Sequence, residues 1–313
     1  MSGHDLGRLI SPTLSLYNPT ESPKVSPVMM QIAILAAIPQ EYRPFQKHVG
    51  KWRQLSRQPF AVWLHQAPHK QVFLVETGMG NKPAAQAAEY LISISPLDLL
   101  VSTGFAGSLA PELQVGDLVW SRELAVWDAE RAAIPMARFC SSHTPHLDVF
   151  REIHDIRAVR FLTQENPRPK TMVTMRLDGL PTVVDMESVP LATLAHHHGV
   201  PFLGLRAISD TLNDEIDWDL GSIVDETGKV RISKVVSTVL RRPGLVTIFH
   251  GHWRDSSVAA RNLAQALLAL LLLPERNLRA LARQLVLHPI PEKAAGPPDT
   301  EETASGADQS ASP

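Results

Sequence analysis

The chain has 313 residues, and its 30 Lys and Arg side chains against 32 Asp and Glu give a formal net charge of -2. This length allows one large α/β domain, and the near balance of charge excludes the basic surface that binds nucleic acid. The single cysteine, Cys140, cannot form an internal disulfide, which favours a reducing, cytoplasmic location.

The two ends of the chain differ in composition from its middle. Residues 1–28 mix Ser, Pro and Gly with few large apolar residues, and residues 289–313 are rich in Pro, Glu, Ala and Ser. We expect both tails to be disordered, with a single domain over residues 29–288. The first tail lacks the pattern of a signal peptide. The most apolar stretch, residues 264–274, is too short to cross a bilayer as a helix.

Apolar runs typical of buried strands alternate with helical patterns along the middle of the chain. We predict strands at 28–37, 71–76, 98–102, 115–121, 182–186 and 201–208, and helices at 83–92, 188–198 and 255–273. An irregular insertion is expected near residues 214–252. The alternation indicates an α/β domain with a mostly parallel central sheet, whose ligand crevice lies beyond the carboxyl ends of the strands.

Polar motifs follow the predicted strands at this edge of the sheet. There are two glycine turns, TGMG at residues 77–80 and TGFAG at residues 103–107, and two acidic strand ends, DMES at 185–188 and RAISD at 206–210. A glycine turn alone can serve tight turning, and an aspartate after a strand can cap a helix. The two turns together with the two acidic ends indicate a functional site.

These blocks resemble the purine nucleoside and uridine phosphorylase superfamily, most closely its methylthioadenosine/S-adenosylhomocysteine nucleosidases. The matching blocks, in the family's order, are residues 36–41, ETGMGNKPAA, STGFAGSLAPELQVGDLV, VVDMES and LRAISD. The resemblance implies a three-layer α/β fold with a mostly parallel mixed central sheet flanked by helices. It also implies cleavage of the N-glycosidic bond of a purine nucleoside, no organic cofactor, and a homo-oligomer.

Three carboxylates receive roles through this resemblance. The glutamate matching Glu187 holds the ribose hydroxyls, the aspartate matching Asp210 supplies a proton to purine N7, and the glutamate matching Glu41 activates water. Breaking the bond builds positive charge on the sugar and negative charge on the base, so an acid and a carboxylate stabilise opposite ends. Glu41 also has an ordinary interpretation, as a first-turn glutamate after Pro39.

The other residues expected to contact the substrate come from the same blocks. They are Met79, Phe105, Ala106, Gly107, Phe161, Met186, Arg206 and Ser209. Phe105 stands where the nucleosidases have a serine, and Asp185 stands where they have a glutamate. The block that supplies their base-stacking aromatic is not recognisable in residues 160–170, where Phe161 is our candidate.

Two alternatives to hydrolysis stay open. Arg43 could bind inorganic phosphate as co-substrate, which would make the protein a phosphorylase, and an inactive nucleoside-binding protein would account for Phe105. We favour hydrolysis, since a carboxylate at Glu41 repels a phosphate dianion. The DMES motif also occurs in superfamily members with larger adenosyl substrates, such as the hopanoid-associated phosphorylases, so we expect an adenosyl-type nucleoside.

Histidines suggest a metal site that their spacing does not support. Consecutive residues of a helix, as at residues 196–198, cannot all face one ion, and His143 and His146 lack a further ligand nearby. We expect no metal. Trp253 and Arg254 before an apolar helix would suit contact with a membrane surface, but a terminal helix packed on the sheet is the better interpretation.

Overall fold

The computed structural model describes residues 29–128, 132–139, 156–165, 168–175, 177, 179–214 and 245–290. The predicted N-terminal tail, most of the C-terminal tail and residues 215–244 of the predicted insertion lie outside the described residues. So do Cys140, His143 and His146.

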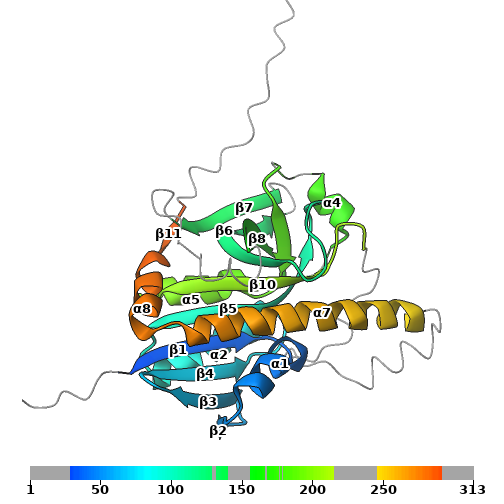
Figure 1. The fold of residues 1–313 in the computed structure, drawn as a ribbon. Helices are drawn as coiled ribbons and strands as arrows, with labels where there is room; N and C mark the ends of the chain where they lie inside the picture. The colour runs from blue at the N-terminus through cyan, green and yellow to red at the C-terminus, as the bar shows by residue number, and fades with distance from the viewer. Residues whose placement is uncertain are drawn as a thin grey trace, which may run out of the picture.

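One mixed sheet runs through the described part of the chain (Figure 1). Its strands are β1 (Met30–Ala36), β2 (Arg53–Ser56), β3 (Ala61–Ala67), β4 (Lys70–Glu76), β5 (Leu99–Ser108), β6 (Leu118–Asp128), β7 (Ala132–Phe139), β8 (Arg157–Thr163), β9 (Thr182–Asp185), β10 (Phe202–Asp210) and β11 (Leu287–Pro289). The order is β11-β7-β6-β8-β9-β5-β1-β4-β3-β2, and β10 pairs with β5 and β6.

Parallel and antiparallel pairs mix at the centre of the sheet, where β9 is antiparallel to β5 and β6 is antiparallel to β10. Strand β5 pairs in parallel with both β1 and β10, and β1 pairs in parallel with β4. Strand β8 is parallel to β6 and β9, whereas the outer pairs β2–β3, β3–β4, β6–β7 and β7–β11 are antiparallel. Parallel strands are buried on both faces, which agrees with the continuous apolar runs of β1 and β4.

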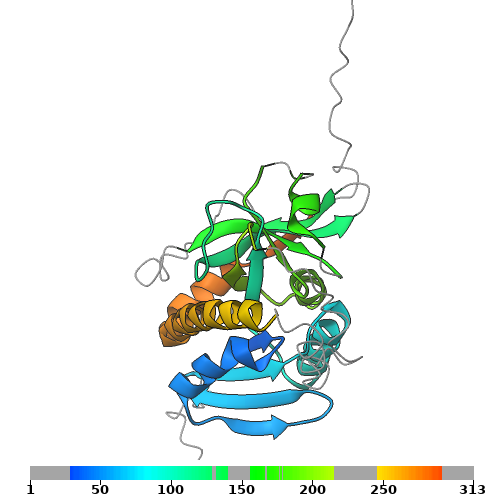
Figure 2. The ribbon, with the colours of Figure 1, turned by 90° about the vertical axis from the view of Figure 1, so that its right-hand side faces the viewer.

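Helices cover both faces of the central strands (Figure 2). Helices α1 (Pro39–Val49) and α7 (Leu245–Leu272) lie on one face, and α2 (Asn81–Ile94) and α5 (Ser188–His197) lie on the other. The short helix α4 (Lys170–Thr174) lies between β8 and β9 in the chain, and α8 (Glu275–Gln284) precedes β11. The arrangement is the three-layer α/β fold that the sequence predicted.

Three details of the prediction are wrong. The TGFAG block is no turn, because β5 continues through it to Ser108. Helix α7 begins at Leu245 rather than at residue 255, since one interior glycine, Gly251, costs a helix only about 1 kcal/mol. Strand β6 begins at Leu118 and continues to Asp128, beyond the predicted end at residue 121.

Within the described residues, no single helix has the length and hydropathy to span a membrane. One bent pair, Ser256–Leu272 with Glu275–Gln284, passes the same test of length and composition only when its two helices are taken together, across a bend of 110°.

Candidate active site

The glycines of the TGFAG block leave room for two carboxylates beside β5. A Cβ atom at Gly104 would lie 2.6 Å from Oε1 of Glu41, and a Cβ atom at Gly107 would lie 2.7 Å from Oδ2 of Asp210. Real Cβ atoms do not approach other atoms so closely. Any residue larger than glycine at either position would therefore collide with a carboxylate. This is the physical reason that glycine occurs inside a buried strand here.

Glu41, in the first turn of α1, accepts hydrogen bonds from three backbone N–H groups. Its Oε2 accepts from Ala37 at 2.8 Å and from Ile38 at 3.1 Å, and its Oε1 accepts from Phe105 at 2.9 Å. The side chain is buried, and this burial raises the pKa of Glu41 above its ordinary value although the N–H groups and Arg206 partly oppose the shift. Glu41 therefore caps its own helix and also reaches β5.

Glu187 lies just before α5 and faces the loop that follows β4. Its Oε1 accepts the backbone N–H of Gly80 at 2.8 Å. Burial, with added repulsion from Asp185 and Glu41, raises the pKa of Glu187 to about 8, although Arg206 acts in the opposite direction. The side chain keeps partial exposure to solvent, so a ligand can reach it.

Arg206 is buried and links the end of β10 to the end of β9. Its Nη2 lies 2.9 Å from Oδ2 of Asp185, 3.0 Å from Oγ of Ser102 and 3.0 Å from Oγ of Ser188. The guanidinium is 1% exposed, and the carboxylate of Asp185 also accepts a hydrogen bond from Thr163 at 2.7 Å. Arg206 is thus a buried support for this edge of the sheet, already engaged by Asp185.

Asp210 ends β10 and accepts hydrogen bonds at both carboxylate oxygens. The hydroxyl of Ser209 lies 2.5 Å from Oδ1, and the ammonium of Lys170 lies 2.5 Å from Oδ2. The Ser209 hydroxyl also lies 3.4 Å from the carbonyl oxygen of Ala106. In parallel register, Asp210 pairs with Gly107 of β5, so the acid is held at the carboxyl end of two neighbouring strands.

The structure brings most of the predicted site residues to this edge, but not Phe161. Phe161 is 0% exposed, and the guanidinium of Arg206 lies 5.7 Å from its ring centroid. Its stacking role stays a prediction, and this core position gives it no support. Met79, Phe105 and Met186 keep partial exposure, and Phe105 packs its ring against the core. Arg43 is exposed on α1.

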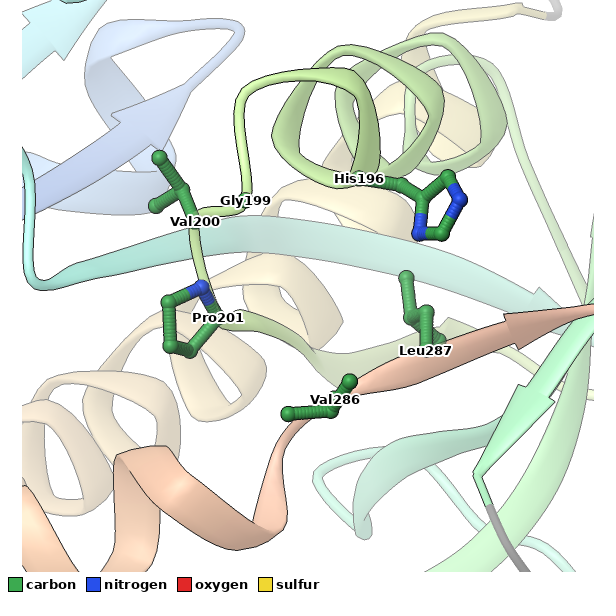
Figure 3. Close-up of a pocket in the computed structure, with 6 residues that line it drawn as sticks. All are labelled: His196, Gly199, Val200, Pro201, Val286 and Leu287. Carbon is green, nitrogen blue, oxygen red and sulfur yellow. The ribbon is translucent and has the colours of Figure 1, made fainter.

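A small pocket of about 60 Å³ lies at the other end of α5, between that helix and β11 (Figure 3). It is lined by His196, Gly199, Val200, Pro201, Val286 and Leu287. Because α5 begins beside Glu187 and rises about 1.5 Å per residue, the pocket is roughly 15 Å from the carboxylates. The pocket is therefore separate from the candidate site.

The model of one protein family, described as the phosphorylase superfamily, matches residues 31–241. The chain belongs to this superfamily. Among its curated relatives, 5'-methylthioadenosine/S-adenosylhomocysteine nucleosidase of Shewanella halifaxensis is 28% identical over 181 residues, covering 51% of this chain and 76% of the relative. The enzyme of the same name from Chromohalobacter salexigens is 25% identical over 234 residues, covering 69% of this chain and 99% of the relative.

Solved structures of the superfamily share this fold. The 5'-methylthioadenosine/S-adenosyl homocysteine nucleosidase of Campylobacter jejuni aligns with a TM-score of 0.55 at 18% identity, over 76% of this chain and 98% of that one. Futalosine hydrolase of Helicobacter pylori aligns with a TM-score of 0.57 at 16% identity, over 77% and 97%. These likenesses confirm the predicted fold class.

The sequence-based prediction missed Lys170 as a partner of Asp210. The two residues lie 40 positions apart in the sequence. Lys170 follows Pro169 in an otherwise unremarkable polar run, so nothing in the local pattern separates it from a solvated lysine. Only the folded arrangement of α4 against the end of β10 reveals the pair.

Proposed function

We propose that this protein hydrolyses the N-glycosidic bond of an adenosyl-type purine nucleoside and releases the free base. The observation that carries the proposal is the convergence of Glu41, Glu187 and Asp210 at the carboxyl ends of β1, β9 and β10, around β5. The relatives named above as nucleosidases bear out the prediction of hydrolytic cleavage of a purine nucleoside.

Glu41 has the properties of a general base for water. Its raised pKa makes the carboxylate a better proton acceptor than an ordinary glutamate. Each carboxylate oxygen has two acceptor positions, and Oε1 uses one for the N–H of Phe105. In the proposed reaction a water molecule uses the second position, and its oxygen attacks C1' while Glu41 takes its proton.

Glu187 and Asp210 act on the two parts of the substrate. Glu187 reaches the ribose hydroxyls from the start of α5, and Asp210 delivers a proton to N7 as the electron pair of the C1'–N9 bond moves onto the base. Gly104 and Gly107, which contact Glu41 and Asp210, are three residues apart on β5, or roughly 10 Å at strand spacing. Both carboxylates are therefore positioned by contacts with the same strand, β5.

Phosphorolysis is the second candidate, and the contacts of the site oppose it. Arg206 would be needed to offset the charge of a phosphate dianion beside Glu41, but its Nη2 already pairs with Asp185 and two serine hydroxyls, and the side chain is buried. Phe105 has no side-chain hydroxyl that could donate to a phosphate oxygen. Water is therefore the better nucleophile for this arrangement.

The deciding experiment measures release of free base from adenosine, inosine, methylthioadenosine and larger adenosylated compounds, each with and without phosphate. We expect phosphate-independent release of base together with free sugar. A sugar-1-phosphate formed only with added phosphate would support the phosphorylase. Binding of a nucleoside without release of base from any compound would support an inactive binding protein.

A further inference from the structure

Lys170 is buried at the start of α4 and makes three contacts with the end of β10. Its Nζ lies 2.5 Å from Oδ2 of Asp210 and 3.3 Å from the backbone oxygen of Asp210, and it also donates to the backbone oxygen of Thr211. The side chain of Lys170 is 7% exposed. The three acceptors match the three N–H bonds of an ammonium group, so this is a built position for a protonated lysine.

Asp210 needs a source for the proton that it gives to the base. Both of its oxygens accept hydrogen bonds in the structure, Oδ1 from Ser209 and Oδ2 from Lys170. Of these two donors, the ammonium of Lys170 is the stronger acid, because an alkylammonium is more acidic than an alcohol hydroxyl. Among the described residues that donate to the Asp210 carboxylate, Lys170 is therefore the one that can protonate it.

We propose that Lys170 is a positioning residue that acts through Asp210, holding its carboxylate and supplying the proton taken by the departing base. This inference rests on the proposed function. The proton moves from Nζ to Oδ2 and from the carboxyl group to N7, while the electron pair of the C1'–N9 bond moves onto the base. Lys170 is left as a neutral amine, and the proton released by the attacking water through Glu41 restores it by way of solvent.

The contacts of β5 support a fixed geometry for this pair. A Cβ atom at Gly107 would lie 2.7 Å from Oδ2 of Asp210 and 3.3 Å from Cε of Lys170, so the strand packs closely against both members. Asp214 in turn accepts hydrogen bonds from the backbone N–H and the hydroxyl of Thr211, at 2.8 Å and 2.7 Å. The chain that follows Asp210 is thereby held where its carbonyl oxygens meet the ammonium.

The test compares substitutions that remove the transferable proton in different ways. Lys170→Arg keeps a positive charge, but a guanidinium does not lose its proton in proteins, so we expect kcat to fall by ~10²-fold or more with KM little changed. Lys170→Ala should be equally slow, and added methylamine or ethylamine should restore part of its rate. A merely structural lysine would not respond to the amine.

Lys70 is the matched control, because it is another buried lysine whose Nζ contacts carbonyl oxygens, those of Leu271 and Leu273. Lys70→Met should lower the melting temperature while leaving kcat near that of the wild type. A double variant, Asp210→Asn with Lys170→Met, should be no slower than Asp210→Asn alone, since both changes interrupt one route.

Three results would overturn the inference: wild-type turnover in Lys170→Arg, no response of Lys170→Ala to any amine, or additive losses in the double variant. These outcomes require a wild-type protein that releases base. If the wild type releases no base from any nucleoside of the panel, the proposed function itself fails, and the two failures are therefore distinguishable.

Discussion

The backbone N–H of Phe105 donates to Oε1 of Glu41 at 2.9 Å, which fixes a side chain of α1 against the middle of β5. Two elements that are far apart in the sequence are thus joined at the atom proposed to activate water. The absence of a side chain at Gly104 permits this contact. The position of the proposed general base therefore depends on a glycine that has no functional group of its own.

Gly104→Ala should reduce turnover by displacing Glu41, because the added Cβ atom would lie 2.6 Å from Oε1. We expect kcat to fall by at least ~10²-fold, the typical worth of a general base. The measurement is steady-state release of base, with circular dichroism to verify folding.

Gly204→Ala is the matched control for this substitution. A Cβ atom there would lie 2.5 Å from Oγ of Ser121, away from the carboxylates. Overpacking of this kind costs about 1–3 kcal/mol of stability. The control should lose stability and keep its kcat, and equal losses of kcat in both variants would refute a specific role for Gly104.

Asp210→Asn should lower the rate of base release by ~10²–10⁴-fold, since an amide keeps the shape of the carboxyl group but cannot pass on its proton. The buried ammonium of Lys170 would also lose its charged partner, so the melting temperature should fall. Single-turnover kinetics separate the chemical step from binding. Near wild-type turnover would leave Asp210 as no more than a structural residue.

Glu41→Gln should slow base release more than it changes KM, because the amide cannot accept a proton from water. The loss should be the same with and without added phosphate. If the variant lost activity only in the presence of phosphate, Glu41 would belong to a phosphate site rather than to a water site.

The pKa of Glu187 predicts a stability that depends on pH. The folded protein keeps the Glu187 proton up to about pH 8, whereas the unfolded chain releases it near the ordinary glutamate pKa of 4.5. Since the folded state binds more protons across this range, the contribution of Glu187 to stability is fully present below pH 4.5 and is lost as the pH rises to about 8. Partial exposure of the side chain moderates the effect.

Glu187→Gln should therefore flatten this dependence. Gln retains an oxygen that can accept the N–H of Gly80, so the comparison isolates the charge. Melting temperatures of the two proteins from pH 5 to pH 9 provide the measurement, and the variant should gain on the wild type as the pH rises. A constant difference would contradict the pKa assignment.

In the wild type, 2'-deoxy and 3'-deoxy nucleosides should be poor substrates, since Glu187 then lacks a hydroxyl partner.

Arg206→Met should destabilise the protein by about 3–5 kcal/mol, because it leaves the buried carboxylate of Asp185 without its ionic partner. Urea denaturation gives the change in free energy of unfolding. The double variant with Asp185→Asn should recover part of the loss. If Arg206 instead bound substrate from solvent, its removal would raise KM with little change in stability.

The sequence was sufficient for the fold class and for the acidic strand ends. The apolar runs of β1, β4 and β10 are long and nearly uninterrupted, so their strand character did not depend on distant contacts. The motifs around Glu187 and Asp210 then lay where parallel strands end. In contrast, the outer strands β2 and β7 are short or partly exposed, and their pairing is set by neighbours that periodicity does not identify.

What the sequence left open at the site has a common cause, which is that local sequence does not identify the residues that pack beside it. Glycines at positions 104 and 107 are equally consistent with a turn and with close approach of a carboxylate, and only the neighbouring α1 and β10 decide between them. The sequence around Phe161 has the pattern of a strand, but it does not show that the ring packs against Arg206 of another strand. Pairs such as Lys170 with Asp210 are visible only after folding.

The charge of the described site limits which compounds it can accept. Its carboxyl groups, those of Glu41, Asp185, Glu187 and Asp210, outnumber its two cations, Lys170 and Arg206, even with a proton on Glu187. A 5'-phosphate would bring further negative charge into this environment, and both cations are already engaged by aspartates. The carboxylates proposed to perform the chemistry would therefore also disfavour nucleotides, and we expect AMP to be a poorer substrate than adenosine.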